Sequence, residues 1–272
     1  MKFPLSARPP FNFHSVVNSH GWRQLAPFSY DETSHTICYI LRLSSGRVVE
    51  LKLRDGIEGV IVETEKLERI ERKEVAQGVT WMFGLDMDFS RFYRASRGEP
   101  KLKHAKKLAL GRVLRSPTLF EDVIKTILTT NTLWTATKNM TLKLVHELGT
   151  ALPTLAPGAS AGENTGTSAS GAGGEVEASV KKAFPTPEAI AASSPAFLKE
   201  KIRTGYRASA IHQLAVRVAS GAFDLESFKT SDLTTLELRK ELLSISGVGP
   251  YAAANLLLMM GRTDFIPIDS WA

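Results

Sequence analysis

Two glycines and a proline stand in the stretch SGVGP, Ser246 to Pro250, directly before the apolar run YAAANLLLMM. Glycine can take a positive φ and allows another backbone to approach closely, and we expect this of Gly247 and Gly249. Proline suits the first turn of a helix, and the free N–H groups there, with the helix dipole, form a site for a phosphate oxygen. The same letters are also compatible with a plain turn between two packed helices, so the rest of the chain must decide.

The composition is that of a globular protein with a basic balance. The chain has 272 residues, of which 43% are hydrophobic and 23% charged, and its formal net charge is +6. That length is sufficient for one large or two smaller hydrophobic cores. A positive net charge favours a polyanionic partner, although solvated lysine faces give the same balance.

The cysteines, the histidines and the N-terminal letters argue against several kinds of site. Cys38 is the single cysteine, which excludes an internal disulfide and any site built from several cysteines within this sequence. The six histidines are scattered without the spacing of metal ligands. The letters MKFPLSARPPFNF carry prolines where a signal peptide needs an apolar run, and no stretch is long enough to cross a membrane. We therefore expect a cytoplasmic protein without a membrane partner.

The first hundred residues predict a small antiparallel sheet with helices. From Thr36, the letters TICYILRLSSGRVVELKL form two β-branched and apolar runs around a Ser-Ser-Gly turn, which is typical of a hairpin. A further strand is predicted at GVIVET, Gly59 to Thr64. The stretch EKLERIERKEVAQGVTWMFGL then changes to helical spacing. One face of that helix is marked by Leu67, Ile70 and Val75.

The remainder of the chain is almost entirely helical in pattern. The stretch SPTLFEDVIKTILTTN predicts a helix with Ser116 as N-cap and Pro117 at the first helical position. Its apolar residues form one stripe, made of Phe120, Val123, Ile124, Ile127 and Leu128. We therefore expect an α+β protein with two domains, residues 1–100 with the sheet and residues 101–272 with helices.

One segment interrupts the helical part. Residues 153–179, from Pro153 to Ser179, are rich in Gly, Ala, Ser and Thr and contain almost nothing that could be buried. Such a segment cannot offset the entropy lost on ordering, so we interpret it as a disordered surface insertion.

The arrangement LLSISGVGPYAAANLLLMMGRTDFIPID resembles the helix–hairpin–helix DNA glycosylase superfamily. The resemblance implies an all-helical helix–hairpin–helix glycosylase domain after the sheet domain. It also implies a catalytic aspartate, which here is Asp269, and an Asp at this place also favours a helix N-cap. The N-terminal part, with MFGLDMDFSRFY, is similar to bacterial 3-methyladenine DNA glycosylase II. Members of the superfamily continue beyond this aspartate with further helices, so we expect this sequence to be C-terminally truncated.

The resemblance implies a set of residues that contact double-stranded damaged DNA. The hairpin residues Gly247, Val248 and Gly249 would hold a phosphate. Asn131 matches the asparagine that 8-oxoguanine glycosylases insert where the flipped base was. In GYRASAI, Tyr206 and Arg207 match a tyrosine that wedges between bases and an arginine that reaches the unpaired partner. Each also has a local interpretation, as core, a solvated charge or a helix C-cap, but their shared order favours DNA binding.

The residue types around the hairpin indicate which bond is cleaved and how. Breaking an N-glycosidic bond builds positive charge on the sugar, which an ionised carboxylate such as Asp269 stabilises. Bifunctional members attack with a lysine where this chain has Tyr251, and no lysine occurs from Glu241 to Ala272. We therefore predict a monofunctional hydrolase acting on an alkylated purine. The resemblance places Tyr251, Asn255 and Met259 in the base pocket, and cation–π candidates are Trp22, Phe28, Trp81 and Tyr251.

No cofactor is expected to be required, but the resemblance implies a structural K⁺ or Na⁺ at the hairpin. Its ligands would be the main-chain carbonyls of Leu243, Ile245 and Val248. Two alternative functions remain open at this point, an 8-oxoguanine-type DNA glycosylase and a non-catalytic helix–hairpin–helix DNA-binding module. In each case we expect a monomer that acts at the bacterial nucleoid.

Overall fold

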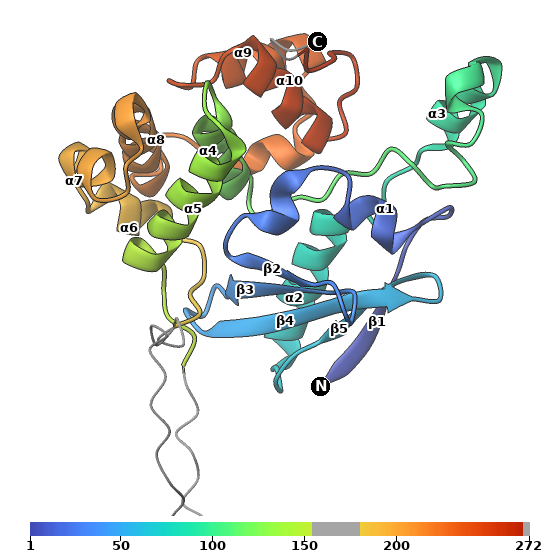
Figure 1. Ribbon diagram of the computed structural model, residues 1–272, viewed down its shortest axis with the longest axis horizontal. Helices are drawn as coiled ribbons and strands as arrows, with labels where there is room; N and C mark the ends of the chain where they lie inside the picture. Colours follow the sequence, from blue (N-terminus) through green and yellow to red (C-terminus); the bar gives the residue numbers. More distant parts are fainter. Residues whose placement is uncertain (154–179, 269–272) are drawn as a thin grey trace, which may run out of the picture.

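A computed structural model describes residues 1–153 and 180–268 (Figure 1). Asp269 and all of the predicted insertion except Pro153 therefore lie outside the described residues. Within the described part, no helix combines the length and the apolar composition that a bilayer crossing requires.

The N-terminal part contains a five-stranded antiparallel sheet with the order β1-β5-β4-β3-β2. The predicted hairpin is β3 and β4, and the predicted third strand is β5. The two edge strands, β1 and β2, were not predicted. The bounds are β1 Lys2–Ser6, β2 Phe28–Asp31, β3 Thr36–Arg42, β4 Val48–Gly56 and β5 Gly59–Glu63.

Helix α2 (Arg69–Phe83) packs on the sheet (Figure 1). The predicted apolar face was partly wrong, because Ile70 is 77% exposed whereas Val75 is fully buried. The helix begins at Arg69, and its inward residues follow the register of Val75, Val79 and Met82. Ile70 lies in the first turn outside that register.

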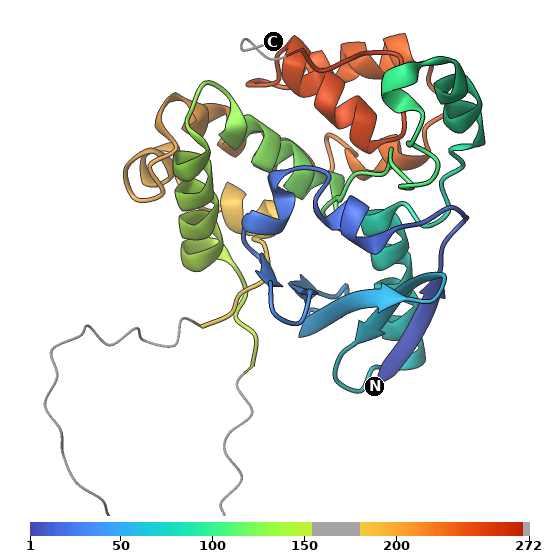
Figure 2. The ribbon, with the colours of Figure 1, turned by 45° about the vertical axis from the view of Figure 1, so that its right-hand side comes forward.

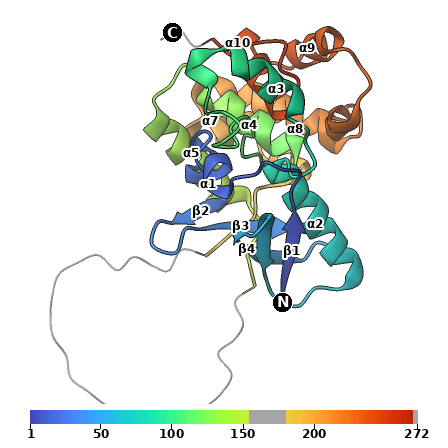
Figure 3. The same cartoon turned by 90° about the vertical axis from the view of Figure 1, so that its right-hand side faces the viewer.

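Most of the remaining helices lie at the other end of the molecule from the sheet, whereas the two short helices before β2 contact it (Figures 2 and 3). Two short helices precede the sheet strands β2 to β5, and the others follow α2. Their bounds are α1 Phe13–Val17, η1 Gly21–Gln24, α3 Ser90–Ala95, η2 Ser96–Gly98, η3 Pro100–Leu102, α4 Leu119–Thr129, α5 Trp134–Leu148, α6 Pro187–Ala191, α7 Pro195–Glu200, η4 Gly205–Arg207, α8 Ala208–Ala219, η5 Glu226–Thr230, α9 Thr235–Leu243 and α10 Pro250–Met259.

Helix α4 runs through the middle of the protein. Its predicted apolar stripe is confirmed, but its polar residues from Glu121 to Thr126 are buried as well. The predicted N-cap was wrong by two residues: the cap is Thr118, whose side chain accepts a hydrogen bond from the N–H of Glu121. Ser116 instead donates its own N–H to Asp122. A helix buried on all sides needs partners for every polar group, and this requirement shapes the site described next.

The largest hydrophobic cluster draws on both the sheet and the helices, and its buried members run from Phe3 to Met259. The division of the chain at residue 100 therefore stays a prediction. The segments that flank residues 154–179 meet in an isolated antiparallel bridge between Ala151 and Lys182.

Candidate functional site

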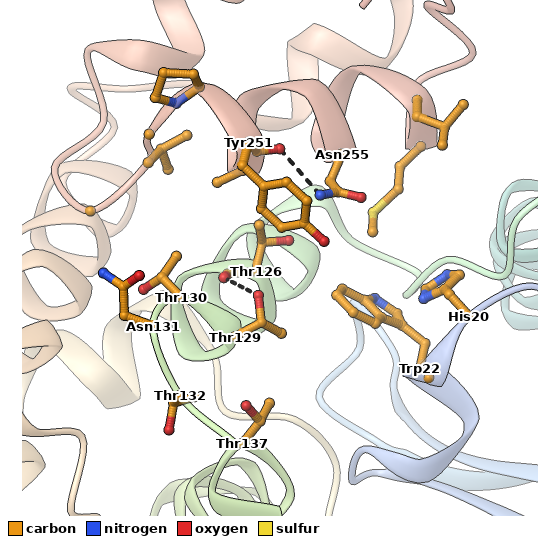
Figure 4. Close-up of a pocket in the computed structure, with 18 of the residues that line it drawn as sticks. His20, Trp22, Thr126, Thr129, Thr130, Asn131, Thr132, Thr137, Tyr251 and Asn255 are labelled. Carbon is orange, nitrogen blue, oxygen red and sulfur yellow. Dashed lines mark hydrogen bonds between the residues drawn. The ribbon is translucent and has the colours of Figure 1, made fainter. Parts of the chain in front are cut away.

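An open cleft of about 1150 Å³ lies between α10, the C-terminal end of α4 and the segment that contains η1 (Figure 4). Most of the predicted site residues line this cleft, although they come from three distant parts of the sequence. They are Asn131, Tyr206, Gly247, Val248, Gly249, Tyr251, Asn255 and Met259.

The turn between α9 and α10 forms one wall of the cleft. The N–H of Val248 donates to the carbonyl of Ile245 at 3.0 Å, and Gly247 takes a φ of +84°. A Cβ at Gly247 would lie 3.1 Å from the Cβ of Ala210, so both conformation and space favour glycine. The expectation of a positive φ at Gly249 was wrong. Its φ is −90° and its ψ −178°, and a Cβ there would meet nothing within 4 Å.

Helix α10 begins with Pro250 at its first position, as predicted. The amides of Tyr251 and Ala252 are in the first turn and have no intrahelical acceptor, because the acceptors would lie before the helix. Among the described residues, neither amide has a hydrogen-bond partner, whereas the next amide, Ala253, donates to Gly249. Two N–H groups at a helix start therefore border the cleft, and such groups favour an anion.

Tyr251 and Asn255 lie one turn apart on α10 (Figure 4). The side-chain amide of Asn255 donates to the carbonyl of Tyr251 at 3.1 Å, which orients it. Tyr251 is 40% exposed. Further along the same helix, the carbonyl of Met259 accepts a hydrogen bond from the buried Arg115 at 2.8 Å.

The end of α4 forms the second wall. Asn131 directly follows the C-cap Thr130 and takes a φ of +45°, the left-handed conformation that often ends a helix. Tyr206 is 66% exposed, and its hydroxyl lies 3.4 Å from the hydroxyl of Thr130. Both side chains are therefore presented at the surface where the helix stops.

Arg207 does not line the cleft in this structure. Its side chain is buried, with the residue 7% exposed, and its guanidinium donates to the carbonyls of Thr130 and Asn131. In this position it holds the loop that follows α4. The predicted contact of Arg207 with an unpaired base would require the guanidinium to leave these carbonyls.

The third wall comes from η1 and the residue before it, and sequence reasoning singled out only one of its residues. The rings of His20 and Trp22 meet edge to face with centroids 4.5 Å apart. The Nε2 of His20 lies 2.6 Å from the carbonyl of Leu114. The pKa of His20 is lowered to about 4, mainly because the ring is buried. The charge of Lys125 makes a smaller contribution in the same direction. His20 is therefore neutral at pH 7, and its Nε2–H donates to Leu114.

Trp22 is oriented by a carboxylate in the protein interior. Its Nε1–H donates to Oδ1 of Asp122 at 2.8 Å, and the same oxygen accepts the N–H of Ser116 at 2.9 Å. The other oxygen, Oδ2, has no hydrogen-bond partner among the described residues. Burial raises the pKa of Asp122 to about 6, against the lowering effect of these donors.

A second buried carboxylate lies on the same helix. Glu121 accepts a hydrogen bond from Nζ of Lys125 at 2.6 Å and another from the hydroxyl of Tyr39 at 2.5 Å. The Lys125 side chain is fully buried, and its Nζ lies 4.7 Å from the centre of the Phe28 ring. Burial and the charge of Glu121 raise the pKa of Tyr39 well above its ordinary value. Polar groups thus connect strand β3, helix α4 and the wall formed by His20 and Trp22, which we call the aromatic wall.

The other aromatic candidates do not line the cleft. Phe28 is buried beneath Lys125. Trp81 lies against Arg115, whose guanidinium carbon is 4.1 Å from the ring centre. Lining residues that the sequence did not reveal are Ser19, His20, Thr126, Thr129, Thr130, Thr132, Trp134 and Thr137. The polar run TTNT after the apolar stripe of α4 is the one local signal that indicated part of this set.

The structure places two more of the predicted residues and leaves one outside. Leu243 ends α9, and Ile245 is buried in the turn. Asp269 lies outside the described residues, but Ile268, which precedes it, lines the cleft.

Neither a protein-family model nor a curated protein sequence matches this chain. Several solved structures, however, are similar to this chain. The 3-methyladenine DNA-glycosylase from Archaeoglobus fulgidus has a TM-score of 0.69 at 20% identity, over 98% of this chain and 81% of that one. The fold is that of DNA glycosylases.

Two further solved structures share this fold, and the name of one of them gives a different base. The apo-form of Clostridium acetobutylicum 8-oxoguanine glycosylase/lyase has a TM-score of 0.67 at 22% identity, over 96% of this chain and 78% of that one. MBOgg1 in complex with a low-affinity DNA ligand has a TM-score of 0.66 at 23% identity, over 96% of this chain and 77% of that one. At these identities the likeness establishes the glycosylase fold, and the activity has to be argued from the cleft.

Proposed function

We propose that this chain is a DNA glycosylase that hydrolyses the N-glycosidic bond of a damaged purine, most favourably an alkylated one. In this proposal α9, the turn and α10 form the helix–hairpin–helix element of a helical glycosylase domain. The observation that carries the proposal is the cleft itself. There, two free helix-start amides, an aromatic wall and the chain leading to Asp269 meet in one space.

The cleft offers a separate place for each part of a flipped nucleotide. The amides of Tyr251 and Ala252 would bind a phosphate, while the base would leave the duplex and enter between α10 and Trp22. A volume of about 1150 Å³ exceeds what one purine needs. The carboxylate of Asp269 would then stabilise the positive charge on the sugar and orient the attacking water.

The residues of the cleft favour a monofunctional hydrolase. A lyase would need an amine to attack the sugar, and no lysine is among the described residues that line the cleft. Tyr251 stands on α10 at the position where bifunctional glycosylases carry the attacking lysine. Lys125 lies close behind the aromatic wall of His20 and Trp22, but its Nζ is fully buried and bound to Glu121.

The hairpin carbonyls fit a structural monovalent cation. The carbonyl of Ile245 accepts one hydrogen bond, from Val248, and keeps a second lone pair. In the described part of the chain, the carbonyls of Leu243 and Val248 accept none. Neutral oxygens of this kind suit K⁺ or Na⁺, which would add positive charge beside the phosphate site.

The choice between an alkylated purine and 8-oxoguanine rests on different residues. Cation–π contact with the partly exposed Tyr251, and with Trp22, which is buried but lines the cleft, favours a cationic alkylated base. The likeness of Asn131, Tyr206 and Arg207 to their counterparts in 8-oxoguanine glycosylases favours the second candidate. The third, a non-catalytic DNA-binding module, requires only the turn and no reacting carboxylate.

Excision assays distinguish these candidates. The full-length gene product is incubated with duplexes that each carry one lesion, which is methyladenine, hypoxanthine or oxoguanine, and release of the base is measured. Asp269→Asn keeps the shape of the side chain but removes its charge, so excision should stop while DNA binding remains. The product should be an abasic site in an uncut strand, and borohydride should trap no covalent adduct. Trapping or strand cleavage without alkali would contradict the monofunctional proposal, and absence of excision on every duplex would leave the binding module.

A further inference from the structure

The positive charge of the chain is concentrated in one short segment. Residues 90–107 contain seven arginines and lysines and one glutamate, which gives this segment a formal net charge of +6. The whole chain also has a formal net charge of +6, so the other residues sum to zero. We call residues 90–107 the basic arm. Its basic residues are Arg91, Arg94, Arg97, Lys101, Lys103, Lys106 and Lys107.

All seven side chains of the basic arm are exposed. Among the described residues, none of them lies within salt-bridge distance of a carboxylate, whereas several cations elsewhere do. The single acidic residue, Glu99, accepts a hydrogen bond from the N–H of Lys101 and caps the short helix η3. Unpaired like charges at this density repel one another, which lowers stability unless a polyanion neutralises them.

The base of the arm is fixed rigidly to the body by one buried arginine. The guanidinium of Arg112 donates to the carbonyls of Gly84 at 2.9 Å, Pro10 at 2.7 Å and Arg8 at 2.6 Å. It also lies 4.9 Å from the ring centre of Phe89. The hydroxyl of Tyr93, on the first helix of the arm, donates to the carbonyl of Leu110 at 2.9 Å, which ties this helix to the segment that follows the arm. The charges are therefore held in a folded element.

The arm arises at the rim of the cleft. Val113, six residues beyond the end of the arm at Lys107, lines the cleft. On the other side, Met87 packs so closely on Gly261 that a Cβ there would lie 2.9 Å from the Met87 sulfur-bound methyl. In the view of Figure 1 the first helix of the arm, labelled α3, lies on the opposite side of α10 from α8. The arm therefore begins close to the rim of the cleft that Val113 lines.

We propose that the basic arm binds the phosphate backbone of duplex DNA beside the damaged nucleotide, as a second contact outside the cleft. This rests on the proposed function, because it takes the cleft as the place of the flipped base. Duplex DNA is the partner that fits, since it carries one negative charge per about 1.7 Å along its axis and needs no shaped pocket. The arm touches no residue assigned to the chemistry, so it should govern affinity and not the rate of bond cleavage.

The test compares two triple variants with the same change in charge. Lys101, Lys106 and Lys107 are replaced by Gln in the arm variant. In the control variant Lys2, Lys66 and Lys73, which are exposed near β1 and α2 at the far end of the molecule, are replaced by Gln (Figure 3). Binding to an undamaged duplex is measured at several salt concentrations, and single-turnover excision is measured at saturating enzyme. Thermal unfolding of each variant checks that it folds.

The arm variant should lose affinity, and the slope of log K against log salt should become shallower by about 0.9 for each phosphate contact removed. The control should bind like the parent protein, and both variants should keep the parent's single-turnover rate. Equal binding by the arm and control variants would overturn the inference and leave the proposed function intact. A salt-dependent loss in the arm variant without excision by any form would support the arm and overturn the proposed enzyme.

Discussion

Two walls of the cleft are built in different ways. The wall at the start of α10 depends on backbone conformation, with a positive φ at Gly247 and free amides at Tyr251 and Ala252. The wall formed by His20 and Trp22 depends on buried charges behind it, above all Asp122. The wall at the start of α10 should therefore lose its shape when the main chain is strained. The wall of His20 and Trp22 should change when a proton or a charge behind it is removed. Each of the following predictions acts on one wall or on neither.

The largest effect is expected behind the aromatic wall. Lys125→Met leaves Glu121 as an uncompensated buried carboxylate, so the free energy of unfolding should fall by about 3–5 kcal/mol. Lys181→Met, which breaks the exposed pair with Glu50, should cost at most about 1 kcal/mol. Urea unfolding of both variants measures the difference, and similar losses would mean that the interior charges contribute no more than surface ones.

The second prediction uses pH. Because the pKa of Asp122 is about 6 in the folded protein and near 3.8 when unfolded, the folded state keeps a proton that the unfolded state has lost. Its contribution to stability falls as pH rises from 4 to 6, by about 3 kcal/mol in total. His20 has the opposite shift, from 6.5 to about 4, so its contribution is lost as pH falls through the same window.

Replacing either residue should reveal the pH dependence of stability that the other one causes. Asp122→Asn should make stability rise more steeply between pH 4 and 6 than in the parent protein, and His20→Gln should make it fall more. Unfolding by urea at half-unit steps of pH provides the measurement. Parallel curves for the two variants and the parent would show that neither group changes its pKa on folding.

The third prediction separates two glycines of the other wall. Gly247→Val puts a β-branched residue at a φ of +84°, which should cost about 1–3 kcal/mol and weaken DNA binding. Gly249→Val has an ordinary φ and open space, so the fold should be unaffected while the side chain blocks a phosphate at the helix start. Stability by urea unfolding and DNA affinity are measured for both. Unchanged affinity in a folded Gly249→Val protein would leave the turn as ordinary packing.

The smallest effect is expected away from both walls. Replacing Pro153 to Ser179 with a short Gly/Ser linker should change the free energy of unfolding by less than about 1 kcal/mol, because the cost of loop closure varies slowly with length. The flanks are already paired, since the N–H of Leu152 donates to Lys181 at 2.8 Å and that of Ala183 to Thr150 at 2.8 Å. A large drop in the melting temperature would show that the segment packs on the body.

The sequence predicted local elements well where one pattern dominates. The central strands β3 to β5 and the stripe on α4 follow from alternation and helical spacing. The edge strands β1 and β2 were not predicted because they are short. In addition, β1 contains Pro4, and proline is tolerated only where a strand has a free edge. Gly249 was misjudged because a glycine before a helix is compatible with both signs of φ.

The residues predicted for the cleft lie on two of its three walls, and on the third wall only Trp22 was singled out, for a physical reason. Asn131, Tyr206 and Tyr251 stand in stretches whose local order is informative. The aromatic wall depends on partners far apart in sequence, such as Trp22 with Asp122 and Tyr39 with Glu121. On a helix with an apolar stripe, Asp122 and Lys125 resemble solvated residues until the fold surrounds them.

The basic arm also determines how the molecule would arrive at a polyanion. Since the rest of the chain sums to zero charge, the net electrostatic force acts on the arm and away from the centre of mass, which produces a torque. At physiological ionic strength the field of DNA reaches only about 8 Å into solution, so a projecting element enters it before the body does. The molecule should therefore turn arm first, and the cleft rim at Val113 follows into place. The arm would then set the orientation of the first encounter as well as the strength of the final complex.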